Sequence, residues 1–484
     1  MVMTLKTNLF INNQEVETNE YTELRDPGRL SDIVGLIAKG TLQHVDQAVN
    51  AAHQAFRSWA LTPLDERISL VLKVANRLEA EANSIARIVS KENGMLLTAT
   101  RIEIGMAVSG IRNAAELARN FFMPKVLEDE TGWVSIEKKP MGVIAGIVPW
   151  NAPVVLTMQK LAPALIAGNT MVFKPSPFAP MGVTEILKLA AEFFPPGVIN
   201  VVHGEGDVGA ALTTHPLVRK ISFTGGGATA KHIMKAAADT LKGIHFELGG
   251  NDAAIILNDA NLEEVVPKIV TAVFRRSGQF CYAIKRIYAP EEMYDHIFEK
   301  MVDLTKEYKI GHQLDERATM GPINNRQQFQ NVRDLIERIK NSSAKIVELG
   351  TKLDPDNWEN GYYLRPILVR DVDPNHDIVT CEQFGPIIPL VSFRTEEEVI
   401  EMVNNSELGL GSSVWSSDFE RSLKIARNIE AGMTFINGAG QTPLGHKYIP
   451  FGGVKQSGIG RENSEMIFDE YTETHGINYH KTNV

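Results

Sequence analysis

Cysteine is scarce in this sequence: Cys281 and Cys381 are the only 2 cysteines among 484 residues. A secreted scaffold held by disulfides carries more cysteine than this, and a C-x-x-C metal motif is absent. The segment from Met1 to Lys6 has neither the hydrophobic core of a signal peptide nor an Arg-rich presequence. These absences favour a reducing, cytoplasmic compartment.

Long hydrophobic runs and an excess of positive charge are also missing. The stretch from Pro140 to Gln159 contains no charged residue, but glycine and proline interrupt it. We therefore expect a strand, a loop and a helix start there rather than a membrane span. The chain carries 49 basic and 59 acidic residues, for a net charge of -10. A general binder of nucleic acid or anionic membranes needs a basic surface, so we expect neither partner.

No histidine pair has the H-x-x-x-H or H-E-x-x-H spacing of a metal site, and we predict no bound metal. The composition, with 44% hydrophobic and 22% charged residues, is that of an ordinary globular protein. A chain of 484 residues is too long for one hydrophobic core. We therefore expect two or three domains.

Short apolar runs alternate with amphipathic runs from about residue 141 onward. This alternation is typical of an α/β fold with mostly parallel sheets, whose ligands bind at the carboxyl ends of the strands. A second series starting near residue 251 indicates a second α/β domain. The predicted strands span 142–148, 170–173, 198–202, 220–223, 244–247, 253–257 and 387–391, and the predicted helices include 153–167 and 228–240.

Cys281 follows Gly278 and Gln279, and we predict an apolar helix directly after it. A lone cysteine is by default a small buried hydrophobe. At the N-terminus of a helix, however, the helix dipole would lower the pKa of the thiol and supply a nucleophilic thiolate. Cys381 has no comparable setting, and we interpret it as structural.

Glu247 ends a predicted strand and is followed by Leu248-Gly249-Gly250. Such a carboxylate commonly has a solvent or ion-pair role, but beside two glycines at a sheet edge it could activate water as a general base. Asn151 either ends a turn or aims its side-chain amide at an oxyanion.

Two further segments have the composition of a nucleotide site. Lys174 is either a solvated lysine or, at a strand end, a ligand for a ribose hydroxyl or a phosphate. The segment Phe223-Thr224-Gly225-Gly226-Gly227 is either a tight turn or a pyrophosphate site that opens a helix. It does not match G-x-G-x-x-G, because Ala230 occupies the last position.

The order and spacing of these segments resemble the aldehyde dehydrogenase superfamily of NAD(P)-dependent enzymes, over about residues 10 to 475. The segments that carry the resemblance are Pro149-Trp150-Asn151, Lys174-Pro175-Ser176, Phe223-Thr224-Gly225, Glu247-Leu248-Gly249-Gly250, Gly278-Gln279-x-Cys281, Glu382-Gln383-Phe384-Gly385-Pro386 and Pro450-Phe451-Gly452-Gly453-x-Lys455-x-Ser457-Gly458.

The resemblance implies catalytic roles for three of these residues. Cys281 would be the nucleophile, Asn151 with the backbone N–H of Cys281 the oxyanion hole, and Glu247 the base that hydrolyses a thioester. It also implies NAD or NADP as the cofactor. The residues implied in cofactor binding are Trp150, Lys174, Ser176, Gly225, Gly226, Glu382 and Phe384.

The resemblance also implies the architecture: an α/β protein with two doubly wound parallel-sheet domains and a small β extension that pairs subunits. The first is a Rossmann-like cofactor domain and the second a catalytic domain, and a homodimer or homotetramer is expected. The implied ranges are 1–121 and 140–250 for the cofactor domain, 251–464 for the catalytic domain, and 122–139 and 465–484 for the extension.

Two departures from the family pattern concern the cofactor. Pro177 stands where many NAD-preferring members have a Glu that holds both ribose hydroxyls, and Gly226 stands where many members have Ser. Loss of the carboxylate removes a group that would repel a 2′-phosphate. NADP is therefore tolerable, and NAD is not excluded.

Arg275 lies six residues before Cys281, at a position that lines the substrate tunnel in the family. Semialdehyde dehydrogenases with carboxylated substrates are similar in carrying Arg there, and a guanidinium suits a carboxylate. An ion pair within the protein is an equal alternative. The helix after Asn151 would offer Val155, Leu156 and Gln159 to the tunnel, and the small Ala152 would leave room for a bulky substrate.

We therefore expect the NAD(P)-dependent oxidation of a small aldehyde, with a carboxylated semialdehyde as the favoured substrate, to its acid. Two alternatives remain open. A CoA-acylating semialdehyde dehydrogenase would not need Glu247, because CoA rather than water takes the acyl group. A non-catalytic nucleotide-binding protein on the same fold would not need Cys281.

Overall fold

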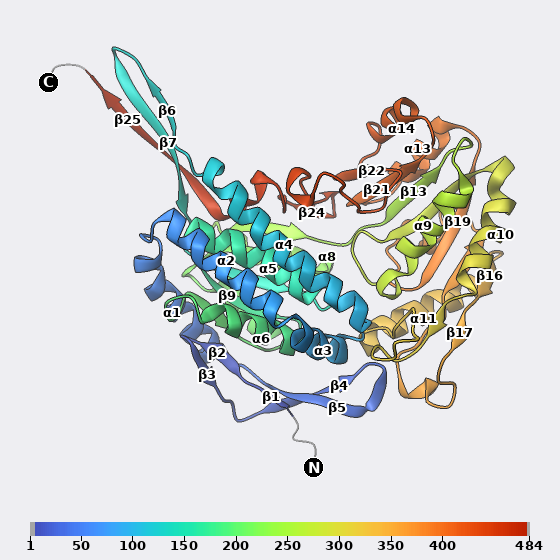
Figure 1. The fold of residues 1–484 in the computed structure, drawn as a ribbon, viewed down its shortest axis with the longest axis horizontal. Coiled ribbons are helices and arrows are strands. Elements are labelled where there is room, and N and C mark those ends of the chain that lie inside the picture. Colours follow the sequence, from blue (N-terminus) through green and yellow to red (C-terminus); the bar gives the residue numbers. More distant parts are fainter. Residues whose placement is uncertain (1–4, 482–484) are drawn as a thin grey trace.

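The computed structural model describes residues 5–481, and Figure 1 shows two α/β units side by side with a long β arm projecting from one of them. Residues 1–4, at the start of the predicted cofactor domain, and residues 482–484, at the end of the predicted β extension, lie outside the described residues. Most of the Met1 to Lys6 segment is therefore not described. No helix within residues 5–481 is long and apolar enough to cross a membrane.

An eight-stranded sheet with the order β24-β12-β11-β8-β9-β10-β2-β3 forms the first unit. Its central strands, β12 to β10 in this order, are parallel, so their carboxyl ends meet at one edge. The central strands are β8 (Val143–Val148), β9 (Thr170–Pro175), β10 (Ile199–Val201), β11 (Val218–Thr224) and β12 (Gly243–Glu247), and the outer ones β2 (Leu9–Ile11), β3 (Gln14–Val16) and β24 (Gly458–Ile459).

The helices of the first unit cover both faces of this sheet (Figure 1). Helix α5 is buried along almost its whole length. Pro153 begins this helix, and Gly168 caps its end in a left-handed conformation, with φ of 98°. The helices are α1 (Leu42–Trp59), α2 (Leu64–Ala80), α3 (Ala82–Asn93), α4 (Leu97–Phe121), α5 (Pro153–Ala167), α6 (Pro180–Ala191), α7 (Gly206–Thr214) and α8 (Gly227–Ala238).

A seven-stranded sheet with the order β16-β18-β19-β14-β13-β21-β22 forms the second unit, and only its edge strand β16 is antiparallel. Its strands are β13 (Asp252–Ile256), β14 (Ile284–Pro290), β16 (Lys345–Glu348), β18 (Ile367–Arg370), β19 (Ile387–Phe393), β21 (Gly411–Trp415) and β22 (Met433–Ile436). Its helices are α9 (Leu262–Phe274), α10 (Tyr294–Thr305), α11 (Arg326–Lys340), α12 (Asp377–Thr380), α13 (Glu396–Asn404) and α14 (Phe419–Ala426).

The α/β fold class predicted from the strand–helix alternation is confirmed by these two sheets. The apolar helix predicted after Cys281 is wrong, because a turn and then strand β14 follow that residue. The segment holds Ile284, Ile287 and Tyr288 beside Lys285 and Arg286, and it is buried along its whole length between β13 and β19. A short segment that is buried on both faces has no periodicity that separates helix from strand.

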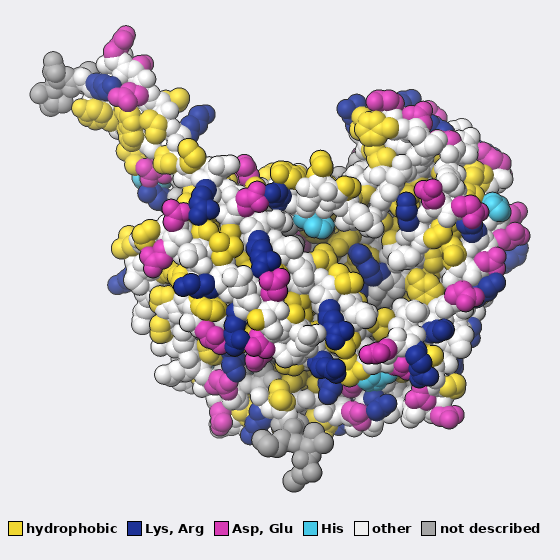
Figure 2. All heavy atoms as spheres, in the orientation of Figure 1, with side chains coloured by type: hydrophobic (Ala, Val, Ile, Leu, Met, Phe, Trp, Pro, Cys, Tyr) yellow, Lys and Arg dark blue, Asp and Glu magenta, His cyan; other side chains and the backbone are white. Residues whose placement is uncertain are grey.

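The β arm consists of β6 (Lys125–Glu128), β7 (Gly132–Pro140) and β25 (Thr472–His480), paired in the order β25-β7-β6. Apolar side chains gather along it in the space-filling view of Figure 2. Leu127 and Tyr479 are 57% and 59% exposed. Both outer strands of the arm keep an open edge within the described chain.

A third small sheet joins the units on the side opposite the arm (Figure 1). It contains β1 (Leu5–Thr7), β4 (Tyr21–Asp26) and β5 (Arg29–Ala38). At its tip Asp26 accepts hydrogen bonds from Gln313 and contacts His312 of the second unit. The remaining short strands are β15 (Lys309–Ile310), β17 (Thr351–Lys352), β20 (Leu408–Gly409) and β23 (Val454–Lys455).

Candidate active site

Cys281 lies where two cavities meet. The helical cavity, of about 1560 Å³ including space open to solvent, is lined by α4, α5 and the segments 275–282 and 433–467. The sheet-edge cavity, of about 1160 Å³ on the same measure, lies at the carboxyl ends of β8, β11 and β12. Asn151, Leu156 and Cys281 line both cavities. A group bound in either cavity can therefore reach the same thiol.

The parallel register of the first sheet brings the predicted residues to one edge. Strand β8 ends just before Asn151, β11 ends just before Gly225, and Glu247 is the last residue of β12. Thr224 pairs with Glu247, and the backbone N–H of Gly225 donates to the Glu247 carbonyl at 3.0 Å. These residues are separated by many positions in the chain but are neighbours in the sheet.

A buried charged pair fixes the backbone around Asn151. Arg276 donates to the Asn151 carbonyl at 3.1 Å, and its guanidinium lies 3.3 Å from the Glu103 carboxylate. Glu103, on α4, also accepts from the first backbone N–H groups of α5, at Val154 and Val155. Within residues 5–481 the side-chain amide of Asn151 makes no hydrogen bond, so its N–H groups are available to a ligand.

The segment before Cys281 has an unusual backbone that depends on one close approach. Arg276, Ser277 and Gly278 all have positive φ, of 54°, 57° and 72°. A Cβ atom at Gly278 would lie 2.3 Å from the Gly385 carbonyl oxygen, so only glycine fits there. Below the thiol, the buried Lys285 donates to the Cys281 carbonyl at 2.6 Å.

The thiol of Cys281 is not activated in the ligand-free protein. Burial raises its pKa to about 12, and only the ammonium of Lys285 acts in the opposite direction. The lowered pKa expected from a helix N-terminus is therefore wrong, because no helix follows Cys281 and the effect of burial on the pKa exceeds that of Lys285. The thiol is protonated at neutral pH, and its attack on a carbonyl requires a proton acceptor.

Glu247 has the environment of a general base. Burial raises the pKa of its carboxyl well above the ordinary value, and the nearby Glu462 raises it further. The ammonium of Lys160 lowers the pKa but does not offset the burial. Neither carboxylate oxygen has a hydrogen-bond partner among the described residues. A carboxylate in this state takes up a proton more readily than one in water.

Residues predicted for the cofactor surround the rest of the sheet-edge cavity. Trp150, Gly225, Gly226, Glu382 and Phe384 line it. The rings of Trp150 and Phe384 meet edge to face, 5.5 Å apart. Glu382 accepts from the Gly250 N–H at 3.2 Å and lies 3.3 Å from the Lys285 ammonium.

Lys174 and Ser176 are not among the residues that line that cavity, and they lie at the end of β9, the strand beside β8. Lys174 is buried, and burial lowers its pKa while Glu205 and Asp207 raise it. A Cβ atom on Gly209 of α7 would lie 3.6 Å from the Lys174 side chain, so Lys174 extends along the start of that helix. The Ser176 hydroxyl accepts from the Phe178 N–H at 3.3 Å.

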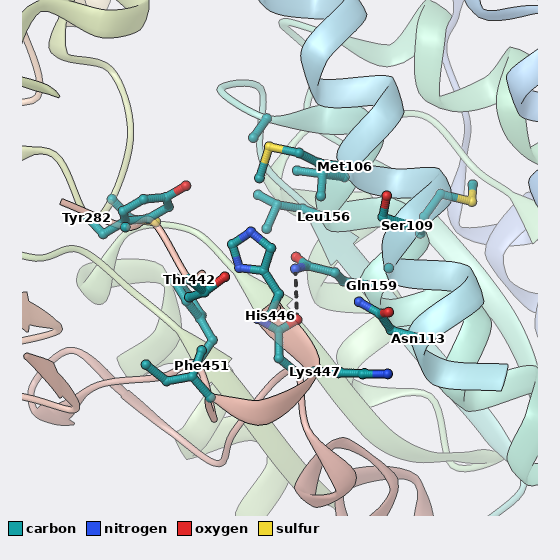
Figure 3. A pocket seen from close by; sticks show the side chains of 18 of the residues that line it. Met106, Ser109, Asn113, Leu156, Gln159, Tyr282, Thr442, His446, Lys447 and Phe451 are labelled. Carbon is teal, nitrogen blue, oxygen red and sulfur yellow. Dashed lines mark hydrogen bonds between the residues drawn. The ribbon is translucent and has the colours of Figure 1, made fainter. Parts of the chain in front are cut away.

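The residues predicted for the substrate line the helical cavity (Figure 3). Val155 and Gln159 line it from α5, and Gln159, which Figure 3 labels, donates to Asn463 at 3.3 Å. The guanidinium of Arg275 lies 4.6 Å from the centre of the Phe280 ring and 5.9 Å from that of Tyr282. Within residues 5–481 no carboxylate forms an ion pair with Arg275, so the alternative of an internal pair is not what this chain adopts.

Sequence reasoning missed the buried charged and polar residues behind the site. One feature of the sequence could have indicated some of them, namely a charged side chain inside a mostly apolar element. Lys160 in α5 and Lys285 in β14 are examples. Cys381, which we interpret as structural, is exposed and lines the sheet-edge cavity. The missed residues are Glu103, Lys160, His245, Arg276, Lys285 and Glu462.

Comparisons with known proteins agree with this geometry. The sequence model of the aldehyde dehydrogenase family matches residues 14–477. FUS7 of Gibberella fujikuroi, named as an aldehyde dehydrogenase, is 34% identical over 86% of this chain and 87% of its own length.

Two solved structures are similar over almost the whole chain. Betaine aldehyde dehydrogenase of Staphylococcus aureus, in complex with NAD+, is 30% identical with a TM-score of 0.93, covering 98% of this chain and 95% of that one. An NADP-dependent enzyme of E. coli is 31% identical with a TM-score of 0.93, covering 98% of each chain.

The raised pKa of Cys281 predicts how the ligand-free protein reacts with iodoacetamide. In a Cys381→Ser variant, where Cys281 is the remaining cysteine, alkylation is expected to be slow at neutral pH. Because only the thiolate reacts, the rate should rise about tenfold for each pH unit into the alkaline range without a plateau. Mass spectrometry of the modified peptide measures the rate. A plateau near neutral pH would show that the thiol is already ionised.

Proposed function

The chain belongs to the aldehyde dehydrogenase family, and from this premise we propose that it oxidises a carboxylated aldehyde to the acid through a thioester on Cys281. The observation that carries the proposal is the meeting of two cavities at Cys281, with Asn151 beside it and Glu247 in the sheet-edge cavity. One cavity has the residues for a nucleotide and the other is lined for an organic substrate.

The sheet-edge cavity fits a dinucleotide. Helix α8 begins at Gly227 with no side-chain cap, so its first N–H groups are free to bind phosphate. A Cβ atom at Gly226 or Gly227 would have no neighbour within 4 Å, which is the open space that a pyrophosphate needs. Lys174 and Glu382 would hold the two riboses, and Phe384 the nicotinamide. A bound nicotinamide would supply the hydride acceptor for the oxidation.

The chain's own residues perform the remaining chemistry. The Cys281 sulfur attacks the aldehyde carbon as its proton leaves to solvent, and the Asn151 amide donates to the oxygen that becomes negative. After oxidation to the thioester, Glu247 takes a proton from water as that water attacks the acyl carbon. The C–S bond then breaks, which releases the acid and regenerates the thiol group.

Hydrolysis, rather than transfer to CoA, is supported by the burial of Glu247. A carboxylate that is kept out of solvent without a hydrogen-bond partner costs folding free energy. A route in which CoA takes the acyl group has no step that uses this base. Only the hydrolytic route gives the buried, unpaired Glu247 carboxylate a catalytic role.

A substrate with a remote carboxylate is supported by Arg275. Its guanidinium is held over Phe280 and Tyr282 in the wall of the cavity that leads to Cys281. With no protein carboxylate paired to it in the described chain, an anionic substrate group would be its natural partner. Apolar side chains of the same wall, including Val155, Leu156 and Phe451, would bind the carbon chain between the two ends.

NAD is supported over NADP by charge at the adenosine end. Pro177 cannot hold ribose hydroxyls, but Glu205 and Asp207 lie close enough to Lys174 to raise its pKa. Both acidic residues stand at the start of α7, along which Lys174 extends. A 2′-phosphate bound near Lys174 would be repelled by these two negative charges.

We also propose that the β arm joins subunits in a dimer or tetramer. Its open strand edges and exposed apolar side chains are costly in an isolated chain and would be covered by pairing with another copy.

Replacement of Glu247 by Gln removes the base and keeps the shape of the side chain. The variant should still release about one equivalent of reduced cofactor per site in a fast burst, because thioester formation precedes the hydrolysis step that needs this base. Steady-state turnover should then fall about 10²–10⁴-fold, the usual contribution of a general base. Rapid-mixing absorbance measures both phases. Wild-type activity that depends strictly on added CoA would overturn the hydrolytic route.

Replacement of Arg275 by Met keeps the length of the side chain and removes its charge. KM for a carboxylated aldehyde should rise about 10–100-fold, the value of a hydrogen-bonded charge pair. KM for a neutral aldehyde of equal size should change little, and Arg275→Lys should lie between the two. An equal rise in KM for both substrates would show that Arg275 does not bind a substrate carboxylate.

The double variant Glu205→Gln, Asp207→Asn keeps both side-chain shapes and removes two negative charges. The ratio of kcat/KM with NADP to that with NAD should rise about three- to tenfold at low salt, a modest effect because both side chains are exposed. The rise should shrink as ionic strength increases. An unchanged ratio at low salt would show that the 2′-phosphate lies away from these residues.

A further inference from the structure

A buried histidine lies beside the base and has no part in the chemistry described above. His245 is two residues before Glu247 on β12, so both side chains project from the same face of the sheet. His245 is 0% exposed and Glu247 is 3% exposed. The ring nitrogen Nε2 of His245 lies 3.6 Å from Oε1 of Glu247.

Both groups lack other partners at these atoms. Among the described residues, Nε2 of His245 and both carboxylate oxygens of Glu247 are buried without a hydrogen bond. A Cβ atom on Gly452 would lie 2.8 Å from Oε1 of Glu247, and one on Gly460 would lie 2.6 Å from Cδ2 of His245. The two glycines therefore leave the space in which the ring and the carboxylate face each other.

The other ring nitrogen of His245, Nδ1, is at hydrogen-bond distance from a pair of linked hydroxyl groups. Nδ1 of His245 lies 3.3 Å from Oγ of Ser222, its register partner on β11. The same Oγ lies 3.0 Å from the phenol oxygen of Tyr471. All three side chains are buried.

The direction of this chain follows from its protonation states. Burial raises the pKa of the Tyr471 phenol well above its ordinary value, so the phenol remains a donor. Burial also lowers the pKa of His245 well below its ordinary value, so the ring is neutral with one N–H. If Tyr471 donates to Ser222 and Ser222 donates to Nδ1, the N–H of His245 is on Nε2 and points at Glu247.

The other charged groups around His245 and Glu247 are already paired, or are bound to the backbone. Lys160 of α5 pairs with Glu462 at 2.9 Å, and Lys220 of β11 pairs with Glu470 at 2.8 Å. Arg461 donates to the carbonyls of Gly453 and Gly460. Lys160, Lys220 and Arg461 lower the pKa of His245, while Glu462 and Glu470 raise that of Glu247.

We infer that His245 is a positioning residue for Glu247, holding the ionised carboxylate through its Nε2–H at the end of the chain Tyr471, Ser222, His245. The inference rests on the proposed role of Glu247 as the base for hydrolysis. A donor to the charged form stabilises the carboxylate and fixes its direction. Loss of that donor should leave thioester formation intact and make the base ionise only at higher pH.

Three substitutions separate the two nitrogen atoms of the ring. His245→Gln places an amide N–H near the position of Nε2, His245→Asn places one near Nδ1 only, and His245→Met fills the space with neither. The measurements are the burst of reduced cofactor and the pH profile of steady-state kcat with one aldehyde. KM is measured in parallel, because a merely structural role would alter binding and the burst as well.

We expect His245→Gln to keep a profile close to that of the wild type. In His245→Asn and His245→Met the acidic limb of kcat should move up by about one pH unit, with about tenfold slower turnover below that limb, while burst amplitude and KM stay within about twofold. If His245→Met does not fold, the Gln and Asn variants decide the question. Identical profiles for these two would overturn the inference.

The failure of the proposed function gives a different result. If wild-type protein reduces no cofactor with any carboxylated or neutral aldehyde, the proposed function is wrong and the histidine series has no readout. If the wild type shows a burst followed by slower turnover and the Asn variant matches it at every pH, only the role of His245 is wrong.

Discussion

Removal of charged side chains from water is the constraint around which this site is built. An ion taken into the protein interior costs several kcal/mol of folding free energy unless it is paired, and the site contains many such ions close together in space. Lys160 with Glu462, Lys220 with Glu470 and Arg276 with Glu103 each answer that cost by pairing. Glu247 is the exception, because it has neither an ion-pair partner at hydrogen-bond distance nor a backbone donor. Its high proton affinity follows directly from this exception.

The same constraint explains why the scaffold must be rigid. An unpaired carboxylate stays buried only if the surrounding elements cannot move apart to admit water. Glu247 ends a central strand, and α5, whose face holds Lys160, packs against the sheet beneath a thick layer of apolar side chains. The thiol is held on the other side by Lys285 and by a backbone turn that tolerates only Gly278. The Glu247 carboxylate and the Cys281 thiol therefore lie on backbone segments whose positions are fixed by packing.

The strands that form the sheet edge could be predicted well, because buried β-branched runs bounded by glycine are a strong local signal. The predicted helix 153–167 matches α5, and the predicted strand 244–247 lies within β12. The helix predicted after Cys281 failed, because every residue of β14 is buried, including Lys285 and Arg286. Side-chain polarity therefore does not separate helix from strand there, and the neighbours in the sheet decide its state. The supporting charges could not be predicted, because Glu103 and Arg276 are far apart in the chain and their pairing exists only in the folded protein. The roles given to Cys281, Asn151 and Glu247 stay predictions.

Strand β24, formed by Gly458–Ile459, returns to the first sheet and pairs with Phe246 and Glu247 at its outer edge. While the protein is being made on a ribosome, β12 is complete long before this partner has been synthesised. The edge of β12 must then wait unpaired through the translation of the entire second unit, a state that invites binding by chaperones. An unfinished nascent chain therefore cannot enclose Glu247 until almost the last part of the polypeptide has been added.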